Sequence, residues 1–269
     1  MQYDPIKQYL GKIFNNSVIL RKLFYKMLDI LLLRSWHIRR EIKGWATTAG
    51  NNTRILDAGA GFGQYVYFLS VLNRNWSVLG IDVKAGQVEE CNRFFEKTGR
   101  KEKVMFRVAD LVTFAEPGAF GLILSVDVME HIAEDERVFA NFYRSLKPGG
   151  MLLVSTPSDQ GGSDVHHEDD HSFIDEHVRD GYSINDINEK LRKAGFSSVT
   201  SRYSYGVPGK ISWKLSIKYP IIILNKSKLF IVILPFYYLL TYWFCLILNW
   251  LDLIVEHRTG TGLIVKAIK

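Results

Sequence analysis

Residues 53–63 read Thr-Arg-Ile-Leu-Asp-Ala-Gly-Ala-Gly-Phe-Gly, a short apolar run that ends at Asp57 and continues into glycines at every second position. This pattern predicts a strand that enters a tight turn, followed by a helix that begins near Gln64. Glycine lets a ligand approach the backbone closely, and the first turn of a helix presents amide groups that lack helical partners. The stretch therefore predicts a loop that binds a nucleotide-like cofactor.

The spacing of these glycines separates two classes of cofactor. A dinucleotide fingerprint requires Gly-x-Gly-x-x-Gly, in which the third glycine allows close packing of helix on strand. Gln64 occupies the sixth position counted from Gly59, so the third glycine is not where that fingerprint needs it. The spacing therefore disfavours a nicotinamide oxidoreductase.

Further apolar runs downstream of this loop also end in acidic residues. The predicted strands cover residues 76–81, 104–109 and 120–126, and they are followed by Asp82, Asp110 and Asp127. Met129-Glu130-His131 comes next, and then a predicted helix with Val138, Phe142 and Leu146 on one face, a turn at 147–150 and a fifth strand at 151–155. This ordered series is much more specific than any one acidic residue.

From residue 53 to about 156, the glycine pattern and the acid-tipped strands resemble the ordered motifs of the class I S-adenosylmethionine-dependent methyltransferases. The resemblance implies an α/β fold, a Rossmann-like seven-stranded sheet with helices on both faces, and S-adenosylmethionine as cofactor. It places Asp82 on the ribose hydroxyls, Asp110 on the adenine amino group and Asp57 near the methionine end. The cofactor-binding residues that it implies are Asp57, Gly59, Ala60, Gly61, Gly63, Asp82, Val83, Asp110, Leu111 and Asp127.

Each of these acidic and imidazole groups also has an ordinary structural interpretation. Aspartate at the end of a strand is often a cap for the next helix. Glu130-His131 recurs in the family as a structural element, and the alternative is that His131 is a general base. The stretch His166-His167-Glu168-Asp169-Asp170-His171 is a solvated loop, a metal site or a lid in which His171 is the base. Because adjacent histidines generally cannot face one site, no metal is predicted.

Charge is distributed unevenly along the 269 residues. Residues 1–50 carry nine Lys/Arg and three acidic residues, a net charge of +6, and residues 205–269 carry eight Lys/Arg and two acidic residues, also +6. Since the net charge of the whole chain is +6, residues 51–204 have a net charge of −6. An acidic centre argues against nucleic acid as a partner, and the basic flanks favour an anionic surface. The two cysteines, Cys91 and Cys245, suggest no disulfide framework, so the sequence predicts a cytoplasmic protein. Charged residues interrupt the apolar run at 18–33, so no signal peptide is predicted.

Both basic flanks are also apolar. Residues 17–43 predict a basic amphipathic helix with Leu20, Phe24, Met27 and Leu31 on one face, suited to a membrane interface or to a substrate lid. Residues 229–248 hold no charge over 20 positions, enough to cross a bilayer.

The topology of the sheet argues against such a crossing. Residues 196–204 and Gly262–Ile268 are expected as the sixth strand and the antiparallel seventh strand, which must lie on one side of a membrane. The apolar piece at 219–224 is too short to be a second span. The insertion is therefore predicted to be a hairpin or interfacial helical unit that Pro235 breaks or kinks, and the alternative is a dimer interface or lid core.

These observations predict an N-terminal helical region at 1–50, a methyltransferase core at 51–206, a hydrophobic insertion at 207–258 and a final core strand at 259–269. Asp127-Val128-Met129-Glu130 stands where amine-methylating relatives carry Asn-Pro-Pro-Tyr, which favours an oxygen nucleophile and looks like the branch containing ubiquinone-pathway O-methyltransferases. The expected acceptor is small or lipid-linked, met by a peripheral or monotopic enzyme on the inner face of a membrane. The alternatives are N- or C-methylation of a soluble apolar substrate and a non-catalytic cofactor-binding scaffold. The oligomeric state stays open.

Overall fold

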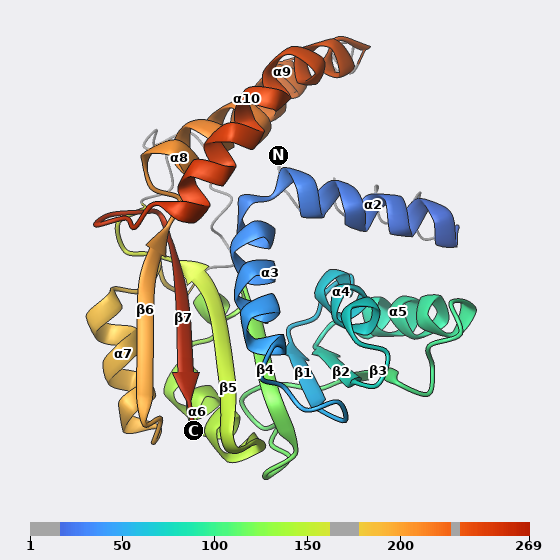
Figure 1. Ribbon diagram of the computed structural model, residues 1–269, viewed down its shortest axis with the longest axis vertical. Coiled ribbons are helices and arrows are strands. Elements are labelled where there is room, and N and C mark those ends of the chain that lie inside the picture. The colour runs from blue at the N-terminus through green and yellow to red at the C-terminus, as the bar shows by residue number, and fades with distance from the viewer. Residues whose placement is uncertain (1–16, 162–177, 227–231) are drawn as a thin grey trace.

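The apolar runs form a seven-stranded sheet in the order β3-β2-β1-β4-β5-β7-β6 in the computed structural model, which describes residues 17–161, 178–226 and 232–269 (Figure 1). The strands are β1 Arg54–Ala58, β2 Ser77–Asp82, β3 Val104–Val108, β4 Phe120–Val126, β5 Leu146–Pro157, β6 Ser198–Ser204 and β7 Gly262–Ile268. Strands β1 to β5 pair in parallel, whereas β7 runs antiparallel to both β5 and β6. The predicted Rossmann-like sheet with an antiparallel last strand is confirmed.

Helices cover both faces of this sheet (Figure 1). They are α2 Val18–Leu31, α3 Leu33–Ala46, α4 Gln64–Leu72, α5 Ala85–Lys97, η1 Met129–His131, α6 Asp135–Ser145, α7 Ile184–Lys193, α8 Val207–Trp213, η2 Lys214–Lys218, α9 Tyr219–Lys226 and α10 Leu234–Ile254. Side chains alternate across each strand, so Ile55 lies in one apolar cluster with Phe94 while Leu56 lies in a second cluster with Phe142. The core therefore has two apolar layers, one on each side of the sheet.

Two expected elements have other bounds. The helix predicted at 17–43 is two helices, because Leu32 takes an extended conformation (φ −93°, ψ 110°) between α2 and α3. Leu146 belongs to β5 rather than to the preceding helix: it pairs with Phe120 of β4, and the pairing shifts register between Phe120 and Leu122. The expected turn at 147–150 is thus part of an irregular strand, with Gly149 at φ 73°.

The insertion between β6 and β7 is a helical hairpin in which α8, η2 and α9 lead away from the sheet and α10 returns to it (Figure 1). Pro235 lies in the first turn of α10, where a missing amide hydrogen costs no helical bond. Pro235 therefore lies where α10 begins and interrupts the helical path of the insertion there, and it does not kink α10. Within the described residues, α10 is the one helix long and apolar enough to cross a bilayer.

Candidate active site

The four predicted acidic residues lie at one edge of the sheet. Strands β1, β2, β3 and β4 are parallel, so their carboxyl ends meet at the same edge. Asp57 and Asp82 lie within the last residues of β1 and β2, while Asp110 and Asp127 follow β3 and β4. The chain order of the strands reverses between β1 and β4, and ligands of open α/β sheets bind in the crevice at such a reversal.

The glycine loop between β1 and α4 has a left-handed backbone at Gly59 (φ 79°), Gly61 (φ 49°) and Gly63 (φ 75°). A Cβ atom at Gly59 would lie 2.3 Å from Val128 Cγ2, so that position admits only glycine. A Cβ atom at Gly61 would meet nothing within 4 Å. Gly61 therefore faces open space, where a ligand can reach the backbone.

Asp82 holds this loop against the end of β2. Its carboxylate accepts hydrogen bonds from the Gly61 amide and from the Lys84 amide, both at 2.9 Å. The residue is partly exposed, and Val83 beside it is exposed. The amides of Gly59 and Ala60 bind the Ile81 carbonyl at 2.9 and 2.8 Å. Because a carboxylate accepts about four hydrogen bonds, Asp82 keeps acceptor capacity for the two hydroxyls of a ribose.

Asp57 is a buried carboxyl group at the base of the loop. Its Oδ2 atom has no hydrogen-bond partner among the described residues. Burial, and then the charge of Asp82, raise the pKa of Asp57 to about 7. A cationic ligand would favour its ionised form, and S-adenosylmethionine carries positive charge on its sulfonium and its amino group. The loop and Asp57 together thus suit this cofactor.

Asp110 caps the backbone that follows its strand, which is the ordinary structural role of an aspartate at a strand end. Its Oδ1 atom accepts the Val112 amide at 2.9 Å and so caps the turn that follows β3. The side chain of Leu111 is buried, and its carbonyl accepts a bond from Asn141 at 2.9 Å. The adenine contact stays a prediction, and the exposed Asp110 carboxylate lies at the correct edge for it.

The sequence motifs did not indicate two further residues at this edge, Arg34 and Tyr205. Arg34 at the start of α3 forms an ion pair with Asp127, and its backbone amide donates to the Tyr205 hydroxyl at 3.0 Å. Asp127 (φ 51°) and Tyr205 (φ 54°) are the described non-glycine residues with positive φ. Such strained conformations concentrate at functional sites. Both contact Arg34, which therefore belongs to this edge of the sheet.

The candidate bases have different positions. His131 ends the short helix η1 and is exposed, whereas Glu130 beside it is buried and accepts a hydrogen bond from Thr156 Oγ1 at 3.1 Å. Burial raises the pKa of Glu130 to about 7. His171 and the other residues of the 166–171 stretch lie outside the described residues. The base roles of His131 and His171 stay predictions.

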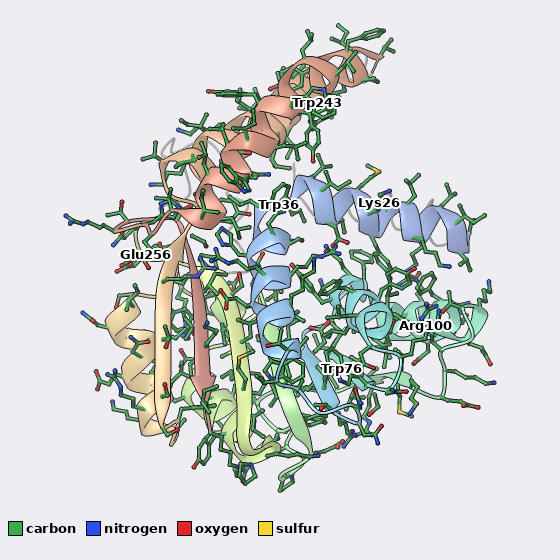
Figure 2. All side chains as sticks on the ribbon, viewed as in Figure 1. Lys26, Trp36, Trp76, Arg100, Trp243 and Glu256 are labelled. Carbon is green, nitrogen blue, oxygen red and sulfur yellow. The ribbon has the colours of Figure 1, made fainter. Side chains whose placement is uncertain are left out.

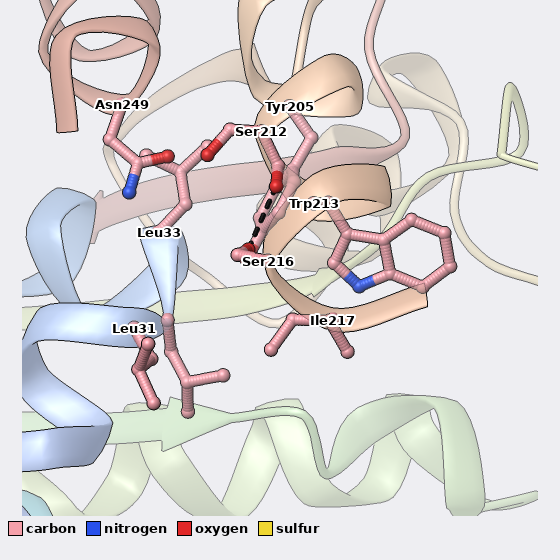
Figure 3. Close-up of a pocket in the computed structure, with 9 residues that line it drawn as sticks. Leu31, Leu33, Tyr205, Ser212, Trp213, Ser216, Ile217 and Asn249 are labelled. Carbon is pink, nitrogen blue, oxygen red and sulfur yellow. Dashed lines mark hydrogen bonds between the residues drawn. The ribbon is translucent and has the colours of Figure 1, made fainter. Parts of the chain in front are cut away.

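A small cavity lies where the hairpin meets the junction of α2 and α3 (Figure 3). Its walls include Leu31, Trp213, Ile217 and Tyr205, and its free volume is about 10 Å³, room for about one water molecule. Ser216 donates to the Ser212 carbonyl at 2.8 Å in its wall. Because Tyr205 lines this cavity and also contacts Arg34, it joins the hairpin to the edge of the sheet.

Comparisons with known proteins agree with this geometry. Residues 55–150 match the family model described as a methyltransferase domain. Phosphoethanolamine N-methyltransferase of Triticum aestivum is 30% identical over 149 residues, which are 55% of this chain and 28% of that protein. The structure of phosphoethanolamine N-methyltransferase 2 of Haemonchus contortus, with phosphomonomethylethanolamine and S-adenosylhomocysteine, has a TM-score of 0.61 at 20% identity, covering 87% of this chain and 53% of that one. The [4+2]-cyclase SpnF has a TM-score of 0.59 at 19% identity, covering 88% and 82%.

These likenesses differ in what they establish. The chain spans about a quarter of the wheat protein and about half of the Haemonchus protein, so it corresponds to only part of each. The structural likenesses show the fold, and a neighbour described as a cyclase illustrates that one fold hosts different reactions. The family model, in contrast, covers the glycine loop and the acid-tipped strands described above. Residues 55–150 therefore form a methyltransferase domain of the class I S-adenosylmethionine-dependent kind.

Proposed function

We propose that this protein transfers the methyl group of S-adenosylmethionine to a hydroxyl oxygen of an apolar or lipid-linked acceptor at a membrane surface. The observation that supports this most is the exposed apolar face of α10, on a hairpin that reaches the carboxyl edge of the sheet through Tyr205. An enzyme whose acceptor lies in a membrane needs such a surface beside its site. The location, the acceptor and the oxygen nucleophile are all parts of this proposal.

The cofactor would be held by groups already in place. The open backbone at Gly61 would receive it, Asp82 would bind its ribose, and Asp57 would face its cationic end. When bound, the sulfonium supplies the methyl group and a thioether leaving group that keeps the electron pair of the broken bond. The chain therefore contributes mainly orientation and exclusion of water.

The acceptor oxygen gains the methyl group and must lose its proton. His131, exposed at the carboxyl edge, and His171 are the proposed proton acceptors. If one of them is the base, the rate should rise with pH as that histidine loses its proton. Alanine at that histidine should flatten the profile and leave cofactor binding intact. Equal profiles for wild type and both variants would contradict this part of the proposal.

The hairpin provides the proposed membrane contact. The residues on α10 whose side chains are more than half exposed are Phe236, Leu239, Leu240, Trp243, Phe244, Ile247 and Trp250. Trp243 is labelled on the part of α10 that projects away from the sheet (Figure 2). Large contiguous apolar patches mark interaction or membrane surfaces, and aromatic residues favour the bilayer interface. The hairpin returns to β7, next to β6, so we place the whole sheet on the cytoplasmic side.

Lipid and glycan extracts test the acceptor. Extracts from cells that lack this protein should contain a species lighter by one CH₂ unit, and the purified full chain with labelled S-adenosylmethionine should convert it to the mature species. The label should resist conditions that release methyl esters and should appear by NMR as a methoxy group. Label on nitrogen or carbon would contradict the oxygen assignment. Cofactor binding without turnover of any extract would favour the non-catalytic scaffold.

Methylation of a phosphorylated amine is a second candidate, because two of the reported relatives are named for phosphoethanolamine. Incubation of the chain with phosphoethanolamine and labelled S-adenosylmethionine, without lipid, separates the two. The first proposal predicts no incorporation above that of a Gly61→Val variant. Rapid incorporation would establish the second candidate instead.

A further inference from the structure

Helix α2 has an inner face and an outer face, and the inner face forms hydrogen bonds to the glycine loop. Arg21 and Tyr25 on this face are 3% and 1% exposed. Arg21 Nη2 donates to the Phe62 carbonyl at 2.9 Å, and the Tyr25 hydroxyl donates to the same carbonyl at 2.5 Å. Phe62 lies between Gly61 and Gly63, so α2 holds the centre of the glycine loop.

The same helix ties that loop to its neighbours. Arg21 also donates to the Glu90 carbonyl at 3.2 Å and to Cys91 Sγ at 3.0 Å on α5. Asp29, near the end of α2, accepts a hydrogen bond from Gln64 Nε2 at 2.8 Å, where α4 begins. Displacement of α2 would thus break hydrogen bonds to the loop, to α4 and to α5. The docked position of α2 stabilises the loop in the conformation seen here.

The outer face of α2 has the composition of a helix at a membrane interface. Ile19, Leu23 and Met27 lie four residues apart and are 77%, 50% and 41% exposed. The exposed lysines Lys22 and Lys26 alternate with them along the same face. Large apolar side chains interleaved with lysine suit the boundary between acyl chains and anionic headgroups.

We propose that this outer face of α2 binds anionic headgroups of the bilayer, and that this contact and cofactor binding strengthen each other through Arg21 and Tyr25. The inference rests on the proposed location at a membrane and adds regulation of the same site. Lys22 and Lys26 place positive charge on this face, which complements an anionic surface. Lys26 on α2 and Trp243 on α10 both lie above the sheet in the view of Figure 2, so the two surfaces are at one end of the molecule.

The coupling follows from a single equilibrium. Only docked α2 presents its outer face at the end of the molecule that also carries the apolar face of α10, so a bilayer that contacts both surfaces favours docked α2. The cofactor binds the loop that docked α2 stabilises. Two ligands that favour the same state raise each other's affinity by the same factor. The membrane should therefore tighten cofactor binding, and the cofactor should tighten membrane binding.

The test uses the full chain on two kinds of vesicle, one of phosphatidylcholine alone and one with added phosphatidylglycerol. Sedimentation reports the bound fraction, and the Kd for S-adenosylmethionine is measured on each. We expect the Kd to be at least about fivefold lower on the anionic vesicles. The double variant Lys22→Glu/Lys26→Glu should lose this difference and keep the wild-type Kd on neutral vesicles. Arg21→Met should weaken cofactor binding on both.

The matched control is Lys103→Glu/Lys147→Glu, which changes exposed lysines before β3 and at the start of β5, at the amino edge of the sheet, and should keep the fivefold difference. Equal Kd values for wild type bound to both vesicles would overturn this inference and leave the proposed function intact. If the control variant also loses the difference in Kd between the two vesicles, the inference is overturned as well. The general surface charge would then explain that difference. Failure of wild type to sediment with either vesicle would instead contradict the proposed membrane location.

Discussion

Helices α6 and α10 differ in the size of the apolar side chains that they bury and in what they leave exposed. Beside Asp135, Asn141 and Ser145, α6 buries the large apolar side chains of Val138, Phe139 and Phe142. The buried residues of α10 are Cys245, Leu248, Asn249 and Asp252, with no aromatic side chain among them. The exposed face of α10 carries Leu240 and Trp243, residues that a core helix would turn inward. Burial of apolar area therefore holds α6 against the sheet, whereas α10 requires interactions of another kind, namely polar ones.

A buried polar cluster at the base of the hairpin holds α10. Asp252 accepts hydrogen bonds from His37 Nε2 of α3 at 2.9 Å, from the Gly209 amide of α8 at 3.0 Å and from the Tyr205 amide at 3.1 Å. His257 lies 3.1 Å from its other side-chain oxygen. The attachment is thus polar and directional, which fixes the orientation of the hairpin while its apolar face remains outside.

The largest expected effect tests the α6 side of this comparison. Phe142→Ala removes a fully buried ring and should lower the free energy of unfolding by about 3–5 kcal/mol, because the lost contacts are only partly recovered by relaxation. Urea unfolding followed by circular dichroism measures this loss. A loss below about 1 kcal/mol would mean that α6 is not held by its apolar face.

The second effect tests the polar attachment of α10. Asp252→Ala leaves several buried donors without an acceptor and should cost roughly 3 kcal/mol. Burial acts to raise the pKa of Asp252, but the hydrogen bond and charge of His37, the charge of His257 and the hydrogen bond from the Gly209 amide together lower the pKa. The stabilisation by Asp252 is therefore present above its ordinary pKa near ~4 and is lost as the pH falls below it. The difference in urea midpoint between wild type and Asp252→Ala should shrink in acid.

Asp57 should make stability depend on pH in the opposite direction to Asp252, because its pKa is raised. In the folded protein it binds a proton more tightly than the unfolded chain does between about pH 4 and the folded value of about 7. Without cofactor, the wild type should lose stability relative to Asp57→Asn as the pH rises across that window. Cofactor affinity should rise with pH through about 7 in the wild type and stay flat in the variant. Parallel pH profiles of stability would show that Asp57 is not the buried acid described here.

The glycine loop and the strand ends could be predicted from the sequence because their signals are local. Residues 120–126 form β4 with the expected bounds, α4 begins at Gln64, and the Ser183 side chain caps α7 by accepting the Asp186 amide at 3.0 Å. An apolar run, a glycine turn and a capping box each depend on residues that are close in the chain. These are the cases in which periodicity and turn chemistry suffice.

The remaining site residues could not be predicted because long-range contacts decide them. Arg21 reads as part of a solvated basic face, yet it is buried because it binds the Phe62 carbonyl 41 positions away. Likewise Arg34 meets Tyr205 across 171 positions, and no motif links the two. Leu146 fits the helical spacing of α6 but pairs with Phe120 in the sheet. In each case tertiary hydrogen bonds override the local pattern.

The smallest effect on stability is expected on the exposed face of α10. Phe244 is 53% exposed, so Phe244→Ser together with Leu240→Ser removes little buried area and should change the free energy of unfolding by less than about 1 kcal/mol. The same change removes two large apolar groups from the proposed membrane face and should reduce sedimentation with vesicles severalfold. Val71→Ser, on the exposed side of α4, is the matched control and should leave sedimentation unchanged. If the α10 variant instead unfolds as readily as Phe142→Ala, its exposed face is packed in the functional state, and a second protein surface rather than a bilayer covers it.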